Sequence, residues 1–161
     1  MLWQPAYVAI GSNLSDPARQ VRVAFDRLAG IADTRLIARS RLYRSVPLGP
    51  QDQPEFVNAC AGLLTQLEPE MLLDALVSIE RAMGKEPPPV RWGPRVIDLD
   101  LLVYAAERRS GPRLVLPHPG LKERNFVLYP LAEIAPTLSV PGLGRIVELA
   151  ARAGDRGLVA E

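Results

Sequence analysis

The chain opens with an apolar run at residues 7–10 that ends at a Gly-Ser-Asn tripeptide, a pattern typical of a short β-strand. Asp16 and Pro17 then provide a helix N-cap and a first helical position. Beyond them, apolar residues recur at helical spacing until Gly30, which ends the predicted helix. This apolar face consists of Val21, Ala24, Phe25 and Leu28. The N-terminal segment therefore predicts a strand followed by a helix.

The next segment predicts two strands and a second helix. Residues 36–46 alternate with a period of two, and residues 56–67 form another β-type run after a turn-rich loop at 47–54. We expect these two strands to pair antiparallel. A helix is predicted to begin near Pro69 and to end at Gly84. Its predicted apolar face consists of Met71, Leu72, Ala75, Leu76, Ile79 and Met83.

The remainder of the chain begins with a Pro-rich segment, residues 85–95, that suits neither a helix nor a central strand. A strand is predicted at 96–104. Further elements are a polar hairpin-like stretch at 107–113, a short strand at 114–116, and helices near 128–134 and 145–153. The order β-α-β-β-α-β with C-terminal additions predicts a ferredoxin-like α+β fold, in which two helices cover one face of an antiparallel sheet. We expect one domain spanning residues 1–161.

Composition restricts the classes of function. The net charge is +1, whereas a protein that grips a nucleic-acid backbone usually has a larger basic excess, so no nucleic-acid partner is expected. No apolar run approaches the roughly 20 residues that a membrane span needs, and the N-terminus does not resemble a secretory signal. We expect a cytoplasmic monomer. The single cysteine, Cys60, lies in an apolar run and is interpreted as a buried, inert thiol.

Asp98 and Asp100 are the sharpest chemical feature. Residues two apart on a strand point to the same face, so both carboxylates project together and Leu99 points away. Two close carboxylates in apolar surroundings repel each other unless a cation lies between them, and Mg²⁺ meets that need with oxygen ligands, waters and substrate phosphates. A structural salt bridge to Arg95 or to another arginine explains the pair equally well.

Cationic residues flank the acidic pair. They are Arg91 and Arg95, with Trp92 between them, Lys85 a little further back, and His118 and Arg124 after the next strand. Taken singly, each arginine is better explained as a solvated surface charge. As a cluster around two carboxylates they predict a clamp for a polyphosphate around Mg²⁺. The chain has no Gly-x-x-x-x-Gly-Lys-[Ser/Thr] loop, so side chains and metal would have to hold the phosphates.

A second group combines an amide with aromatic rings. Phe56 and Asn58 share a strand face, and Phe126 could contribute the opposite face of a stacked heterocycle. Buried core aromatics and a satisfied buried amide are the structural alternative, which the pattern alone favours.

Together these residues carry a resemblance that runs nearly end to end. The matching segments are Ala9-Ile10-Gly11-Ser12-Asn13-Leu14, Tyr43-Arg44-Ser45, Pro47-Leu48-Gly49-Pro50-Gln51-Asp52-Gln53-Pro54, Phe56, Asn58, the run from Arg91 to Asp100, and Pro117-His118-Pro119. In this order they resemble the 6-hydroxymethyl-7,8-dihydropterin pyrophosphokinase family. The resemblance implies transfer of pyrophosphate from ATP to the pterin hydroxymethyl group, with release of AMP, in folate biosynthesis.

The resemblance also implies roles for single residues. Asp98 and Asp100 would bind two Mg²⁺ ions that bridge the ATP phosphates and the attacking hydroxyl. Residues implied to bind ATP are Arg95, His118 and Arg124 at the phosphates, Glu80 and Leu101 near the adenosine, and Arg91 and Trp92 on a loop that closes over it. Residues implied to bind the pterin are Asn58 at its edge, Phe56 and Phe126 on its faces, and Ser45, Pro47 and Leu48 at the rim.

The sequence departs from the family pattern at a few positions. Val77 stands where a Gln often faces the adenine, prolines occupy 87–89, where further basic residues are common, and Pro119 replaces a frequent Tyr. Two alternatives to the enzyme remain: a non-catalytic nucleotide- or RNA-binding module, and a relative that binds pterin without catalysis. Aromatic residues are only 6% of the chain, and it contains no RNP-type segment. The retained acidic pair, Arg95, His118 and Arg124 argue against the non-catalytic relative.

Overall fold

The computed structural model describes residues 2–46, 52–85 and 94–161. In chain order, the strands and helices are β1 (Gln4–Ser12), α1 (Pro17–Ala29), β2 (Thr34–Arg39), β3 (Tyr43–Ser45), β4 (Phe56–Thr65), α2 (Pro69–Ala82), β5 (Asp98–Tyr104), β6 (Arg109–Ser110), β7 (Val115–Leu116), the 3₁₀ turn η1 (Leu121–Glu123), α3 (Asn125–Ile134), β8 (Ser139–Val140), β9 (Gly144–Arg145), α4 (Ile146–Ala153) and β10 (Leu158–Ala160). This is the predicted β-α-β-β-α-β order followed by C-terminal additions.

The main sheet has six strands and is antiparallel at every pairing. Its order is β10-β3-β4-β1-β5, and β2 pairs with the part of β4 that β3 leaves uncovered. The long strand β4 is buried along nearly its whole length because layers cover both of its faces. The predicted ferredoxin-like α+β fold is confirmed.

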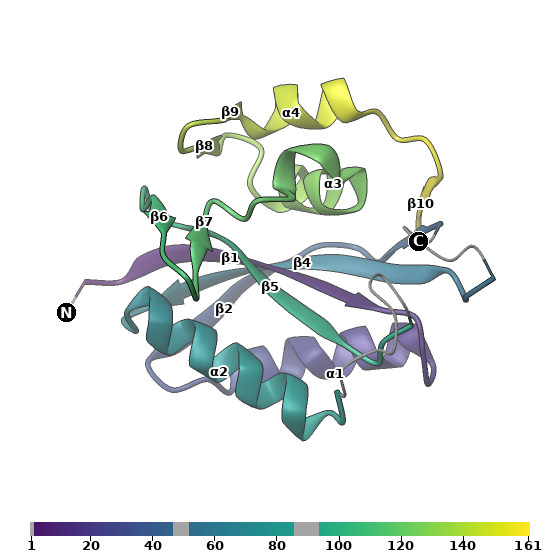
Figure 1. Cartoon of the computed structure of the whole chain (residues 1–161), viewed down its shortest axis with the longest axis horizontal. Coiled ribbons are helices and arrows are strands. Elements are labelled where there is room, and N and C mark those ends of the chain that lie inside the picture. The colour runs from purple at the N-terminus through teal and green to yellow at the C-terminus, as the bar shows by residue number, and fades with distance from the viewer. Residues whose placement is uncertain (1, 47–51, 86–93) are drawn as a thin grey trace.

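Helices lie on both faces of this sheet (Figure 1). Helices α1 and α2 cover one face, and α3 and α4 lie over the other. Two clusters of buried apolar residues correspond to these two layers, one containing Phe25 and Leu72 and the other Leu128 and Ile146. The prediction of helices on one face was therefore incomplete, since the C-terminal additions build a second layer.

Both early helices begin and end close to the predicted positions. Helix α1 starts at Pro17 and is capped at its end by Gly30, but Asp16 has a left-handed conformation (φ 62°) and its side chain makes no capping hydrogen bond. Helix α2 is followed by Gly84 with φ of +89°. Placing Met71 on the buried face was wrong: it is 56% exposed, because the buried stripe passes through Leu72 and Leu76 instead.

The predicted strand at 36–46 is two strands, β2 and β3, separated at residues 40–42. At the break, the Ser40 backbone N–H donates to the Cys60 carbonyl at 3.0 Å, and the Cys60 N–H donates to Ser40 Oγ at 2.9 Å. A register shift between Leu36 and Ala38 precedes it. Cys60 itself is buried, as predicted, and burial raises the pKa of its thiol far above the ordinary value.

Among the described residues, no helix is long and apolar enough to cross a membrane.

Candidate active site

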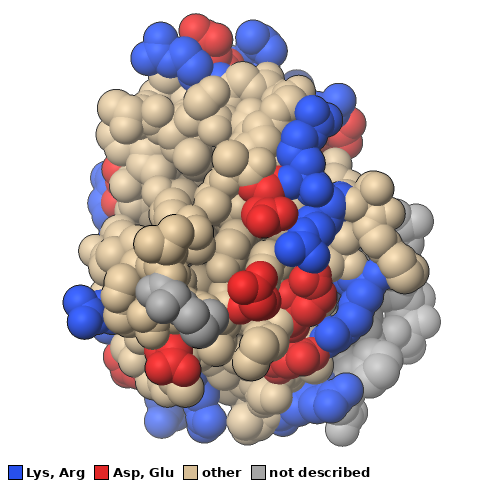
Figure 2. Space-filling view, turned by 90° about the vertical axis from the view of Figure 1, so that its left-hand side faces the viewer, with Lys and Arg blue, Asp and Glu red and all other residues tan. Residues whose placement is uncertain are grey.

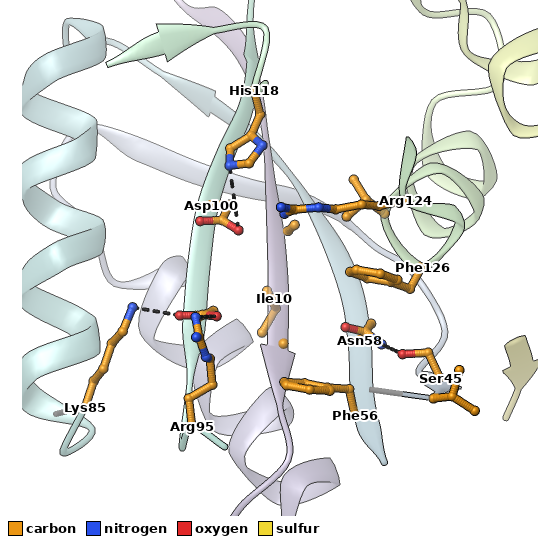
Figure 3. A pocket seen from close by; sticks show the side chains of 15 residues that line it. Ile10, Ser45, Phe56, Asn58, Lys85, Arg95, Asp100, His118, Arg124 and Phe126 are labelled. Carbon is orange, nitrogen blue, oxygen red and sulfur yellow. Dashed lines mark hydrogen bonds and ion pairs between the residues drawn. The ribbon is translucent and has the colours of Figure 1, made fainter. Parts of the chain in front are cut away.

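A cavity of about 320 Å³ opens on the sheet face beneath α3, near the ends of β1, β4 and β5. Its lining residues are Ala9, Ile10, Gly11, Ser45, Val46, Phe56, Asn58, Lys85, Arg95, Asp98, Asp100, His118, Arg124, Phe126 and Val127. Figure 3 shows Lys85, Arg95, Asp100 and His118 on the β5 side and the two phenylalanines on the β4 and α3 side, with Asn58 between them. Arg124 extends from the α3 side toward the charged groups (Figure 3). The cavity thus has a charged half and an aromatic half.

Asp98 is held by two cations. Its Oδ1 accepts a hydrogen bond from Lys85 Nζ at 2.7 Å, and its Oδ2 accepts one from Arg95 Nη1, also at 2.7 Å. The predicted salt bridge to Arg95 is therefore present, and it lies at the cavity rather than in the core. Leu99 is 4% exposed and packs in the opposite layer, which confirms that the two aspartates share one face of β5.

Asp100 is paired with His118, whose Nε2 lies 3.9 Å from Asp100 Oδ2. The Gly120 backbone N–H donates to His118 Nδ1 at 3.2 Å, which assigns the ring proton to Nε2 and directs it toward the carboxylate. Burial raises the pKa of Asp100, an effect that the charge of His118 opposes and that of Asp98 reinforces. Burial also lowers the pKa of His118, against the opposing influence of Asp100.

Glu80 and Leu101 do not line the cavity. Glu80 lies beside it on α2, where its Oε2 accepts hydrogen bonds from the Leu99 backbone N–H at 2.8 Å and from Lys85 Nζ at 2.9 Å. Burial raises the pKa of Glu80, although both hydrogen bonds oppose that rise. The Leu101 side chain is 3% exposed and belongs to the core beneath α1 and α2. Glu80 therefore supports β5 and Lys85 from behind the acidic pair.

The aromatic half of the cavity is organised around Asn58. Its Nδ2 donates to Ser45 Oγ at 2.7 Å, and both residues are about 5% exposed or less. The pairing of β3 with β4 sets this contact. Ser45 lies opposite Phe56, and Asn58 is two residues further along β4 on the same face of the strand. A Cβ atom at Gly11 would come within 3.2 Å of Asn58 Oδ1, so glycine leaves room for the amide. Phe126, on the first turn of α3, lies across the cavity from Phe56 (Figure 3).

Nine of the residues expected at a site line this one cavity: Ser45, Phe56, Asn58, Arg95, Asp98, Asp100, His118, Arg124 and Phe126. Pro47, Leu48, Arg91 and Trp92 lie outside the described residues. Lys85, which the sequence placed among the cations near the acidic pair without a specific role, also lines the cavity.

Among the described residues, no group of three or more His, Cys, Asp and Glu side chains gathers as a metal cluster. Of the residues that line the cavity, Asp98 and Asp100 are the carboxylates, and as a pair they could hold a metal ion together with water and substrate. That arrangement is usual for Mg²⁺ bound together with phosphates.

Comparison with known proteins places the chain in a class of transferases, the pyrophosphokinases. A family model for 7,8-dihydro-6-hydroxymethylpterin-pyrophosphokinase (HPPK) matches residues 7–136. The 2-amino-4-hydroxy-6-hydroxymethyldihydropteridine pyrophosphokinase of Pseudomonas aeruginosa is 47% identical over 155 residues, covering 96% of this chain and 95% of that protein. The enzyme of the same name from Haemophilus influenzae is 42% identical over 154 residues, covering 96% of each. The chain belongs to the HPPK family.

The fold agrees with solved structures of that family. Plasmodium falciparum HPPK-DHPS A437G with pteroate superposes with a TM-score of 0.73 over 93% of this chain, at 14% sequence identity. The chain spans 41% of that longer protein. At this identity the similarity demonstrates a shared fold.

Proposed function

We propose that the protein transfers a pyrophosphoryl group from ATP to the hydroxymethyl group of 6-hydroxymethyl-7,8-dihydropterin in folate biosynthesis and releases AMP. The observation that carries this proposal is a single cavity that joins a carboxylate pair and several cations to an oriented amide between two aromatic rings. The charged half suits a polyphosphate. The aromatic half suits a flat heterocycle with hydrogen-bonding edges.

The acidic pair fits Mg²⁺ in its donor chemistry. Asp98 and Asp100 offer hard oxygen donors on one strand face, and both line the cavity. We propose that the two aspartates hold two Mg²⁺ ions. When bound, these ions would neutralise phosphate charge and orient the phosphates for displacement.

The cationic side chains would then bind the triphosphate. Arg95, His118 and Arg124 reach the cavity from three different segments, so they can contact different phosphates. Arg91 and Trp92 are proposed to contribute to the same site. Near the adenosine we propose Glu80 and Leu101. Because Glu80 is occupied by the Leu99 N–H and the Leu101 side chain lies in the core, their contribution there would be to hold the backbone of β5 in place.

For the pterin, Asn58 would pair with the edge of the ring, and Phe56 and Phe126 would stack on its two faces. Ser45 fixes the amide by accepting from Asn58 Nδ2, and Pro47 and Leu48 are proposed at the rim. This arrangement would place the hydroxymethyl group toward Asp100 and Arg124. The pterin would then be oriented before any bond changes.

In the reaction, the hydroxymethyl oxygen forms a bond to the β-phosphorus of ATP. The bond between that phosphorus and the oxygen bridging to the α-phosphorus breaks, AMP leaves with the bridging oxygen, and the hydroxyl proton is lost. In-line phosphoryl-type transfer depends mainly on alignment and charge neutralisation, so the positions of Arg95, His118 and Arg124 matter more than a strong base.

Identifying the nucleotide product tests the proposed function. Protein incubated with Mg·ATP and 6-hydroxymethyl-7,8-dihydropterin should yield AMP and the pterin diphosphate in equal amounts. ADP would instead indicate an ordinary kinase, and no turnover would leave a binding module. Asp98→Asn and Asp100→Asn should both abolish turnover, whereas Asp74→Asn, on the exposed face of α2, should leave it near the wild-type value.

The non-catalytic alternatives are weaker. An RNA-binding module of this fold usually presents a basic surface with exposed aromatics. The face in Figure 2 instead carries acidic side chains directly beside the basic ones.

We propose that the protein acts as a cytoplasmic monomer on small molecules. Light scattering coupled to gel filtration would test the oligomeric state.

A further inference from the structure

Lys85 has an unusual position for a residue just past the end of a helix. Its ammonium lies between two carboxylates, 2.7 Å from Asp98 Oδ1 and 2.9 Å from Glu80 Oε2. Its side chain is 27% exposed and that of Glu80 is 11% exposed, so the contacts are partly shielded from water. Burial disfavours the charge on Lys85, but the hydrogen bonds and charges of Asp98 and Glu80 outweigh it and raise its pKa.

This position conflicts with the proposed metal site. A carboxylate that binds Mg²⁺ directs an oxygen at the ion from about 2.1 Å. In the structure, however, Lys85 lies against one oxygen of Asp98 and Arg95 against the other. The ion pair of Asp100 is longer, with His118 Nε2 3.9 Å from its Oδ2. A divalent ion entering between the two aspartates therefore meets the ammonium at Asp98 Oδ1.

Glu80 provides a second partner for the displaced ammonium. Its Oε2 is fixed by the Leu99 backbone N–H at 2.8 Å, on the strand that carries both aspartates. Lys85 can lose Asp98 and still keep this contact, so its charge need not become isolated. If the Lys85 side chain turned away from Asp98 while keeping its contact with Glu80, its ammonium would still line the cavity in which the phosphates are proposed to bind.

We propose that Lys85 is the built-in counter-ion of Asp98 in the absence of metal, and that binding of a divalent ion releases its ammonium to the ATP phosphates while Glu80 retains it. Lys85 is then a phosphate-binding residue whose availability depends on metal binding. This inference rests on the proposed function, because it takes Asp98 and Asp100 as metal ligands.

The composition of the chain makes the release directly observable. Lys85 and Lys122 are the only lysines, so protein without a tag, grown with lysine labelled with ¹³C at the ε carbon, should give two lysine signals by NMR. A Lys122→Arg variant assigns them. Addition of Mg²⁺ without nucleotide should move the Lys85 signal toward that of a solvated lysine and leave Lys122 in place. Sodium chloride at matched ionic strength should move neither.

A binding measurement provides the second readout. Lys85→Met removes the competing charge but keeps the length of the side chain, so Mn²⁺ should bind about tenfold more tightly in the absence of nucleotide, as measured by electron paramagnetic resonance. Lys85→Arg and Lys122→Met should bind Mn²⁺ as the wild type does. Unchanged or weaker binding by Lys85→Met would overturn the inference, as would a Lys85 signal that stays fixed at saturating Mg²⁺.

The outcomes separate this inference from the proposed function. If the wild type binds Mn²⁺ and Asp98→Asn abolishes that binding while the Lys85 signal does not move, the metal assignment stands and the role of Lys85 is wrong. If the wild type binds no Mn²⁺ with or without ATP, the metal site itself is wrong and both fail.

Discussion

Asn13 exchanges two hydrogen bonds with Arg95, one of the residues that line the cavity. The Asn13 backbone N–H donates to the Arg95 carbonyl at 3.1 Å, and the Arg95 N–H donates to Asn13 Oδ1 at 2.9 Å. Asn13 Nδ2 also donates to Gln53 Oε1 and to the Pro54 carbonyl, both at 3.0 Å. One asparagine, 1% exposed, therefore holds together two segments that flank the site.

Asn13→Ala should consequently misplace Arg95 and lower turnover at least tenfold. It leaves the partly buried backbone N–H of Arg95 without this acceptor, a loss of about 1 kcal/mol. Asn13→Asp keeps the acceptor for Arg95 but loses the donor to Gln53 and Pro54, so it should retain more activity than Asn13→Ala. Steady-state kinetics and urea unfolding of both variants test this. Equal impairment of the two would assign the effect to the Gln53 and Pro54 side instead.

Ser45 should control the affinity for the pterin through the amide that it orients. Ser45→Ala removes the acceptor of Asn58 Nδ2 and should raise KM for the pterin about tenfold, which corresponds to about 1.4 kcal/mol, with little change in KM for ATP. Ser45→Thr keeps the hydroxyl and should restore most of the affinity. Ser40→Ala is the matched control, since Ser40 also has a buried hydroxyl bonded to β4 but lies away from the cavity. A parallel rise in both KM values would point to a general loss of structure.

Much of this arrangement could be predicted because it depends on local periodicity. The two-residue period of a strand was enough to place Asp98 and Asp100 on one face, and Phe56 with Asn58 on another strand. Helix ends at Pro17, Gly30 and Gly84 follow from residue types that act within one turn.

The remainder depends on contacts between distant segments. The break at residues 40–42 follows from hydrogen bonds between Ser40 and Cys60, which the alternation of side chains does not encode. Likewise, the hydrogen bonds of Glu80 to Leu99 and Lys85 follow from the way α2 packs on β5, which no local pattern encodes. Pairing of Lys85 with Asp98 depends on that same packing.

Glu80 should therefore matter to stability more than a typical helical glutamate. Glu80→Ala leaves the buried Leu99 N–H without an acceptor and removes one partner of Lys85, so the free energy of unfolding should fall by about 2 kcal/mol. Glu70→Ala, on the same helix, removes only a partly exposed ion pair with Arg109 and should cost less than about 1 kcal/mol. Urea unfolding at neutral pH compares the two, and similar losses would contradict the anchoring role of Glu80.

The C-terminal strand β10 should stabilise the aromatic half of the cavity, although it lies beyond residues 7–136, which the family model matches. It pairs with β3, where Leu158 lies opposite Ser45 and Ala160 opposite Tyr43. Removal of residues 155–161 exposes that edge of β3 and should raise KM for the pterin more than KM for ATP. Glu161→Ala, which removes only the exposed ion pair to Arg44, serves as the control and should change neither value. Unchanged pterin kinetics after truncation would show that β3 holds Ser45 without help.

Cys60 should make stability depend on pH in alkaline solution. Burial raises the pKa of its thiol in the folded state, from an ordinary value of 9.0. The folded state therefore keeps the proton, whereas the unfolded chain releases it above about pH 9. The contribution of this thiol to the free energy of unfolding is fully present below that pH and decreases as the pH rises. The loss should approach about 1.4 kcal/mol per pH unit. Guanidinium unfolding of wild type and Cys60→Ala should show that the stability advantage of the wild type shrinks by about that amount between pH 8 and pH 10. A difference that stays constant over this range would mean that the thiol ionises equally easily in both states.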